Sequence, residues 1–184
     1  MLVEKILFIL WFFLPSGVAN TAPIVAVKLP MLKQWSAPLD FGPTFRGIRI
    51  FGEHKTIRGI VVGIITGIAI VILQQYIYAT NQWVQAFVPI DYTMLPTLSF
   101  GLLISIGPLA GDLVKSFCKR QIGLKPGDSW VPFDQLDYIV GAIVATAFIL
   151  PLSFTDYLIS IIVWFIIHPI ATAIGFATGL RKKD

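Results

Sequence analysis

Residues 111–120 read Gly-Asp-Leu-Val-Lys-Ser-Phe-Cys-Lys-Arg. The next charged residues along the chain are Lys125, Asp128, Asp134 and Asp137. Together they place four cations and four carboxylates in 26 residues of a chain that is otherwise apolar. Of the 184 residues, 56% are hydrophobic and 13% are charged, whereas a soluble domain averages ~25% charged residues. This composition predicts a membrane protein with one dense charged segment beside its helices.

Several windows of 18 or more residues carry no charge, which predicts transmembrane helices. The five predicted spans cover residues 2–18, 57–79, 93–109, 136–152 and 157–180. We therefore expect an all-α integral membrane protein, a single domain over residues 1–184, with no room for a separate soluble domain. The helical pattern of the third span continues through Arg120, so its end would stand in water. The first span also resembles a signal peptide, but the chain after it is polytopic, so we expect a retained helix.

The basic residues predict the orientation of these spans. Nearly all of them lie in three places, the polar loop at residues 20–56, the charged segment and the C-terminal tail. Lys and Arg stay on the cytoplasmic side of a membrane. We therefore expect an external N-terminus, a cytoplasmic C-terminus, and a shared cytoplasmic face for segments 20–56 and 110–136. Two distant segments could then build one site.

The charged segment contains residue types that bind phosphate and metal. Asp112, Lys115, Ser116 and Lys119 lie on one face of a helix, and Arg120 borders that face. Lys and Arg bind phosphate oxygens, and carboxylates hold the divalent ion that neutralises them. The pattern favours nucleotide or pyrophosphate chemistry. The alternatives are that Asp112 caps a helix and that the cations extend to the headgroups.

Asp134 and Asp137 are one helical turn apart at the start of the fourth span. Two carboxylates at this spacing can reach one cation, and Mg²⁺ takes one or two carboxylates beside phosphate oxygens and water. The alternatives are that Asp134 caps the helix and that Asp137 pairs with a nearby cation. In the first loop, Lys55 and Thr56 precede the second span, and a helix N-terminus with such donors attracts phosphate.

Three further features have more than one interpretation. Gly59, Gly63 and Gly67 recur every four residues, a stripe that favours close helix packing, and lipid tails could also lie along it. His168, near the middle of the fifth span, is either a functional residue or a satisfied core histidine. Cys118 is the single cysteine and is expected to pack as a small hydrophobic residue.

Several function classes are not favoured. No Ser-His-Asp or Cys-His arrangement, zinc-ligand spacing or Walker loop is apparent. Nucleic-acid binding is not expected, because the basic residues lie close to the predicted spans rather than along an extended stripe. A non-enzymatic membrane protein, such as a small transporter subunit, would carry polar residues along its spans, whereas here the charges gather on one face.

Four segments resemble the CDP-archaeol synthase family, which is related to phosphatidate cytidylyltransferase. They are Ala-Asn-Thr-Ala-Pro at 19–23, Pro-Leu-Asp-Phe-Gly at 38–42 with the continuation at 49–59, the charged segment at 111–137, and His-Pro at 168–169. The charged segment is the most specific, since Ser116, Lys119, Arg120, Lys125, Pro132, Asp134 and Asp137 follow the wider cytidylyltransferase spacing. The His-Gly-Gly step of the bacterial enzymes is replaced here by Phe-Asp-Gln at 133–135, which favours the archaeal-lipid branch.

The resemblance implies a reaction and a site. A lipid phosphate with isoprenoid chains, 2,3-bis-O-geranylgeranylglycerol 1-phosphate, would attack the α-phosphorus of CTP with Mg²⁺ as cofactor, giving CDP-archaeol and pyrophosphate. The expected catalytic residues are Asp134, Asp137, Lys119 and Arg120. The expected metal ligands are Asp134, Asp137 and Asp112. The expected nucleotide-binding residues are Lys55, Thr56, Asp112, Ser116, Lys125 and Asp128. A phosphatidate cytidylyltransferase acting on ester lipids is the nearest alternative.

Overall fold

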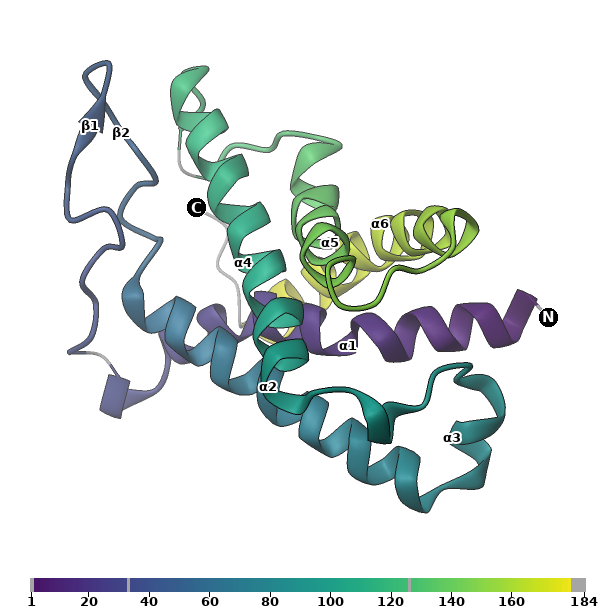
Figure 1. The fold of residues 1–184 in the computed structure, drawn as a ribbon. Helices are drawn as coiled ribbons and strands as arrows, with labels where there is room; N and C mark the ends of the chain where they lie inside the picture. Colours follow the sequence, from purple (N-terminus) through teal and green to yellow (C-terminus); the bar gives the residue numbers. More distant parts are fainter. Residues whose placement is uncertain (1, 33, 126, 180–184) are drawn as a thin grey trace.

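The computed structural model describes residues 2–32, 34–125 and 127–179. In chain order the elements are α1 (Leu2–Ala26), η1 (Pro30–Leu32), β1 (Thr44–Phe45), β2 (Ile48–Arg49), α2 (Ile57–Thr80), α3 (Gln82–Phe87), η2 (Tyr92–Met94), α4 (Thr97–Gln121), α5 (Phe133–Thr146) and α6 (Phe154–Ala177) (Figure 1). The C-terminal tail, which helped to predict the orientation, lies outside the described residues, as do Lys33 in the first polar loop and Pro126 in the charged segment.

The predicted all-α membrane architecture is confirmed. Within the described residues, α1, α2, α4 and α6 are long and apolar enough to cross a membrane. The helix in the predicted fourth span, α5, has 14 residues and is therefore ~21 Å long, shorter than a ~30 Å hydrocarbon core. The described residues thus contain five apolar helices of 14 residues or more where five spans were expected, and five complete crossings stay a prediction.

The first helix is longer than its predicted span. It was expected to end at residue 18, with a loop from residue 20, but α1 continues through Pro23 to Ala26. Ala19, Ala22 and Ala26 are all buried, because this last part of α1 packs against α2. The sequence becomes less hydrophobic after residue 18, so the position of the helix end depends on this contact with α2 and not on the local pattern.

The glycine stripe of α2 is a packing face. A Cβ added at Gly63 would lie 2.8 Å from the carbonyl oxygen of Ala19 in α1 and 3.0 Å from Leu109 in α4, and one at Gly67 would overlap Ser105. The expectation that lipid tails lie along this stripe is therefore wrong, because α1 and α4 already occupy it. The packing interpretation is the correct one.

Helices α4 and α5 also touch backbone to backbone. A Cβ at Gly111 would lie 2.1 Å from the carbonyl oxygen of Asp137, and one at Gly141 would lie 2.2 Å from that of Gly107. No side chain separates the two helices at these points. Figure 1 shows them side by side, with the short α5 beside the C-terminal half of α4. This contact brings the carboxylates of α5 next to the lysines of α4.

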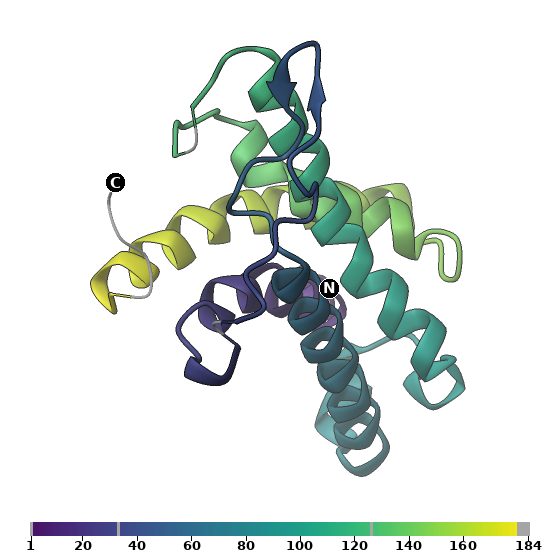
Figure 2. The same cartoon turned by 90° about the vertical axis from the view of Figure 1, so that its left-hand side faces the viewer.

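The first polar loop lies at the same end of the molecule. Its β1–β2 hairpin stands beside the C-terminal end of α4 (Figure 2), where the rings of Phe45 and Phe117 have centroids 5.9 Å apart. The loop then returns to α2, since Leu39 N donates to the Lys55 carbonyl at 2.7 Å. The two segments predicted to share one face therefore do meet.

Replacing Gly63 by leucine should loosen the contact among α1, α2 and α4. We expect the Gly63→Leu protein to lose roughly 1–3 kcal/mol of stability, because the added side chain would overlap backbone. Thermal unfolding in detergent measures this loss. The matched control is Ile65→Leu, a change at an exposed position two residues along the same helix. Equal melting temperatures for the two variants would contradict the packing role.

Candidate functional site

Six charged side chains form one connected group, which we call the ion-pair cluster. They come from the residue before the α2 cap, from α4 and from the start of α5. The members are Lys55, Asp112, Lys115, Lys119, Asp134 and Asp137. Three ammonium groups thus face three carboxylates, so the cluster is electrically balanced.

Lys115 is the centre of this cluster. Its Nζ lies 2.7 Å from Asp137 Oδ2 and 3.1 Å from Asp112 Oδ1. The same Nζ lies 3.5 Å from Asp134 Oδ1. The helical spacing predicted Lys115 on the charged face of the helix, without a specific role in the site. Its spacing of three residues from Asp112 was the available signal, whereas its contacts with α5 depend on the packing of the two helices.

The other two lysines tie the cluster to the loops. Lys55 donates to Asp112 Oδ2, which fixes the first loop to α4. Lys119 donates to both oxygens of Asp134, at 3.0 and 3.2 Å, and also to the Asp128 carbonyl. Lys119 is buried, and such a charge is stable only when it is paired and hydrogen-bonded. The short α4–α5 connection is thereby held against the helix end.

The structure shows which of the three aspartates caps a helix and which pairs with a cation. Asp112 lies within the continuous helix α4, so it is not a cap. Asp134 is in the first turn of α5, whose N-cap is Pro132 without a side-chain cap bond, and Asp134 Oδ2 accepts from Trp130 N. Asp137 does pair with a nearby cation, and that cation is Lys115.

The remaining predicted site residues surround the cluster without joining it. Thr56 Oγ1 accepts from Gly59 N at 3.2 Å and so caps α2. Ser116 Oγ donates to the Asp112 carbonyl at 2.8 Å. Lys125 N donates to Asp128 Oδ2 at 2.7 Å, which forms a turn in the α4–α5 connection. Within the described residues, Arg120 Nε is buried with no hydrogen-bond partner.

Arg58, in the first turn of α2, is buried. Its Nη1 donates to the carbonyl oxygen of Leu32 at 2.8 Å. The first loop is therefore held at the start of α2 by two contacts. Leu39 N donates to the carbonyl of Lys55, just before Thr56, and Arg58, just after it, donates to the carbonyl of Leu32. These contacts hold Lys55 in place beside Asp112.

Asp40 organises the first loop, a role that sequence analysis missed. Its carboxylate accepts from Phe51 N at 3.0 Å, from Gly52 N and Gly42 N at 3.2 Å, and from Arg49. Burial of the carboxylate raises its pKa, but these hydrogen bonds outweigh burial and lower the pKa to about 2. The signal in the sequence was an aspartate followed by closely spaced glycines.

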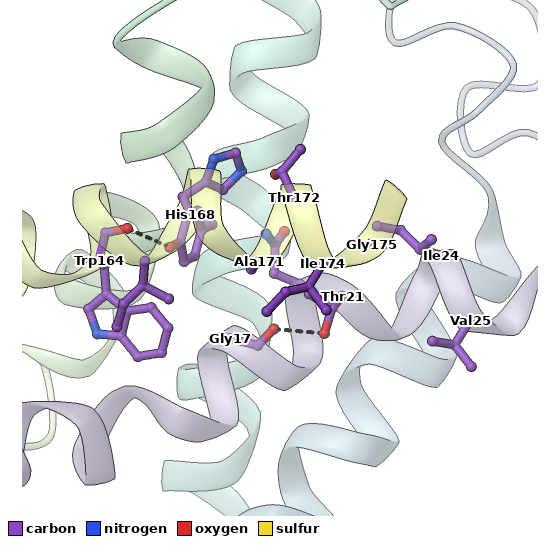
Figure 3. Close-up of a pocket in the computed structure, with 13 residues that line it drawn as sticks. Gly17, Thr21, Ile24, Val25, Trp164, His168, Ala171, Thr172, Ile174 and Gly175 are labelled. Carbon is purple, nitrogen blue, oxygen red and sulfur yellow. Dashed lines mark hydrogen bonds between the residues drawn. The ribbon is translucent and has the colours of Figure 1, made fainter. Parts of the chain in front are cut away.

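His168 lines a pocket between α1 and α6 that is separate from the ion-pair cluster. The pocket is about 150 Å³ in volume, and Figure 3 shows Trp164 of α6 on the side of Gly17 of α1, with the His168 ring on the other side of α6. The His168 ring lies against that of Tyr138, with centroids 5.7 Å apart. Tyr138 follows Asp137 in the chain, so this pocket adjoins the cluster without containing any of its charges.

The three carboxylates of the cluster are the candidate metal ligands. In the described ranges, no group of three or more His, Cys, Asp or Glu residues is arranged to hold a metal ion directly. Asp112, Asp134 and Asp137 nevertheless each direct one oxygen to within 3.5 Å of the same ammonium. Their oxygens are the ligands that Mg²⁺ prefers. The donor chemistry is therefore of the kind that suits a divalent ion, and in this structure the three carboxylates surround the Lys115 ammonium group.

Comparisons with known proteins give consistent results. A family model described as CarS-like CDP-archaeol synthase matches residues 2–183. A CDP-archaeol synthase from Thermofilum pendens is 32% identical over 175 residues, covering 94% of this chain and 77% of that one. Another, from Methanospirillum hungatei, is 36% identical over 152 residues, covering 79% and 87%.

One solved structure is also similar. It is described as structural insight into an intramembrane enzyme for archaeal membrane lipids biosynthesis. The TM-score is 0.70, with 26% sequence identity over 89% of this chain and 92% of that one. The likeness extends over nearly the whole helical fold.

The Asp40 network predicts a pH-dependent loop. A carboxyl with a pKa lowered from 3.8 to about 2 contributes stability that is present above pH ~4 and is lost as pH falls through about 2. Asp40→Asn should mimic the low-pH state at neutral pH. We expect faster hydrogen exchange at the amides of Phe51 and Gly52. Asp91→Asn, at an exposed carboxylate outside this loop, is the control, and equal protection in both variants would contradict the role of Asp40.

Proposed function

We propose, from the premise that this chain belongs to the CDP-archaeol synthase family, that the ion-pair cluster is its active site. The chain is a multi-pass membrane enzyme that forms CDP-archaeol in a CTP-dependent reaction. The observation that supports the cluster as its site is the convergence of three carboxylates on the single ammonium of Lys115. The family favours this activity over a phosphatidate enzyme or a transporter subunit.

The chemistry explains why cations are needed here. An oxygen of the lipid phosphate attacks the α-phosphorus of CTP, the bond from that phosphorus to the β-phosphate oxygen breaks, and pyrophosphate leaves. Both reactants are anions, so fixed positive charge must offset their repulsion and stabilise the charge that spreads over the transferring group. The phosphate nucleophile is already ionised near neutral pH, so positioning matters more than a base.

The lysines of the cluster could exchange partners when the substrates bind. Lys55, Lys115 and Lys119 now neutralise the three aspartates, and the same ammonium groups can bind phosphate oxygens instead. Arg120, whose Nε is buried and unpaired within the described residues, adds a further donor at the end of α4. Lys125 and Asp128 would flank the nucleotide from the α4–α5 connection.

A divalent ion, which we propose to be Mg²⁺, would be held by Asp134, Asp137 and Asp112. When bound it would neutralise charge on the triphosphate. Lys115 gathers one oxygen of each aspartate around a single ammonium group. Because Lys55 and Lys119 also pair with Asp112 and Asp134, the carboxylates are freed when all three lysines exchange partners. We further propose that the cluster faces the cytoplasm, because the basic residues of both polar segments lie at this end.

Neutralising either α5 aspartate should abolish the reaction. We expect Asp134→Asn and Asp137→Asn each to reduce turnover by a factor of at least 10², because each removes a charged ligand from the site. The assay incubates purified protein with labelled CTP, Mg²⁺ and the isoprenoid lipid phosphate and counts lipid-soluble label. Asp91→Asn, at the N-cap of η2 away from the cluster, should keep wild-type turnover. Near-normal rates in both α5 variants would defeat the assignment.

The exchange model also predicts metal binding without turnover. Lys115→Met should bind Mn²⁺ more tightly than wild type when CTP is absent, by about tenfold or more, because the competing ammonium is gone. Electron paramagnetic resonance of free Mn²⁺ gives the dissociation constant. Lys5→Met, whose ion pair with Asp156 lies outside the cluster, should leave that constant unchanged. Weaker or equal Mn²⁺ binding in Lys115→Met would show that the three carboxylates do not form the ion site.

A further inference from the structure

We propose that an apolar groove between α4 and α5 holds an isoprenoid chain of the lipid phosphate and delivers its phosphate to Lys115. This inference rests on the proposed function, because it assigns the second substrate of the same site. The occupant is the substrate lipid itself rather than an ordinary membrane lipid.

The groove is large and almost entirely apolar. Its volume is about 780 Å³, several times that of the pocket beside His168. Its walls include Leu103, Ile106 and Val114 from α4 and Val140, Val144 and Phe148 from α5 or the turn after it. Val114, Val144 and Phe148 are more than half exposed in the chain, so the groove opens sideways, where a lipid chain in the membrane could enter.

Glycines of both helices form the floor of the groove. Gly107 and Gly111 of α4 contact α5 at Gly141 and the Asp137 carbonyl with no side chain between them. Apolar side chains of α4 and α5 on either side of this contact form the walls of the groove. As at the stripe on α2, the neighbouring helix occupies the space that the missing side chains leave, and here that close contact forms the bottom of the groove.

One end of the groove is charged, and that end belongs to the ion-pair cluster. Lys115 and Asp137 line both features. Among the residues that line the groove, Lys115 is the one cation. An anionic headgroup with an apolar tail would therefore have a single favourable direction, with its phosphate at Lys115 and its tail pointing toward Leu103 and Phe148.

The length also fits a lipid chain. From Cys118 to Leu103 the groove follows 15 residues of α4, which is ~22 Å at 1.5 Å per residue. One leaflet is about half of a ~30 Å hydrocarbon core, so the groove covers the depth that one lipid chain occupies. A neutral membrane lipid could contact the walls but would leave Lys115 without a phosphate.

The test places a bulky side chain in the middle of the groove. Val144 lies seven residues from Asp137, or ~10 Å along α5, and is 58% exposed. Val144→Trp should raise the KM for the long-chain isoprenoid lipid phosphate about tenfold, the scale on which apolar pockets discriminate. The KM for CTP should stay within about twofold. The control, Ile162→Trp, alters an equally exposed residue of α6 (59%).

A second substrate separates a groove effect from general damage. A lipid phosphate with the same headgroup but chains too short to extend ~10 Å should be used equally well by wild type and Val144→Trp. If Val144→Trp impairs both substrates alike, or if Ile162→Trp has the same effect on the long-chain substrate, the groove assignment is overturned.

Crosslinking keeps the groove testable without turnover. A long-chain lipid phosphate with a diazirine near its chain end should label α4 and α5 of the wild-type protein, and excess unlabelled lipid phosphate should compete. Labelling spread over α2 and α6, or competed equally by a neutral membrane lipid, would overturn the inference and indicate ordinary lipid contact. A wild-type protein that transfers no cytidylyl group would instead refute the proposed function, while the crosslink still decides the groove.

Discussion

The pairing of Lys115 with three aspartates is the interaction on which the rest of this structure depends. Charged groups at the edge of a membrane are costly unless they are paired. Two of the aspartates lie on a different helix from the lysine. The pairing therefore requires the start of α5 to lie beside the C-terminal half of α4. The same requirement explains why α4 continues for several residues past its apolar part. Its charged end is stable there because α5 and the first loop supply counter-charges.

Close helix contact makes that pairing geometrically possible. Side chains larger than hydrogen at Gly111 or Gly141 would push α5 away from α4, and the distances from Lys115 to the α5 carboxylates would then lengthen. The glycines of α2 act in the same way at the other side of the bundle, where they seat α2 against α1 and α4. The first loop follows α2, so this second contact positions Lys55 beside Asp112. Small residues in two interfaces therefore fix a charged site in which none of them takes part.

The proposed active site lies where the membrane meets water. A nucleotide arrives from water and carries several negative charges, whereas the lipid phosphate arrives within the membrane with its chains still in hydrocarbon. In our proposal, Lys115 stands at the junction, since it belongs both to the ion-pair cluster and to the apolar groove. Its charge is balanced by carboxylates until the substrates bind, which avoids leaving an unpaired ammonium beside the lipid.

Much of this organisation was predictable from local patterns. Runs of apolar residues located the helices, helical spacing put Asp112, Lys115 and Lys119 on one face, and the order of four motifs led to the family that the comparisons confirm. The distribution of Lys and Arg predicted that two distant loops lie at the same end of the molecule. These predictions succeed because helix periodicity and membrane partition depend on neighbours close in sequence.

The tertiary structure decided the rest. It made Lys115 the centre of the cluster, turned the α2 stripe toward α1 and α4 instead of lipid, extended α1 to Ala26, and gave Asp40 its place in the first loop. It also left a groove beside α5. None of these follows from periodicity, because a helix face, a glycine or a charge acquires its partner only when elements far apart in the chain pack together.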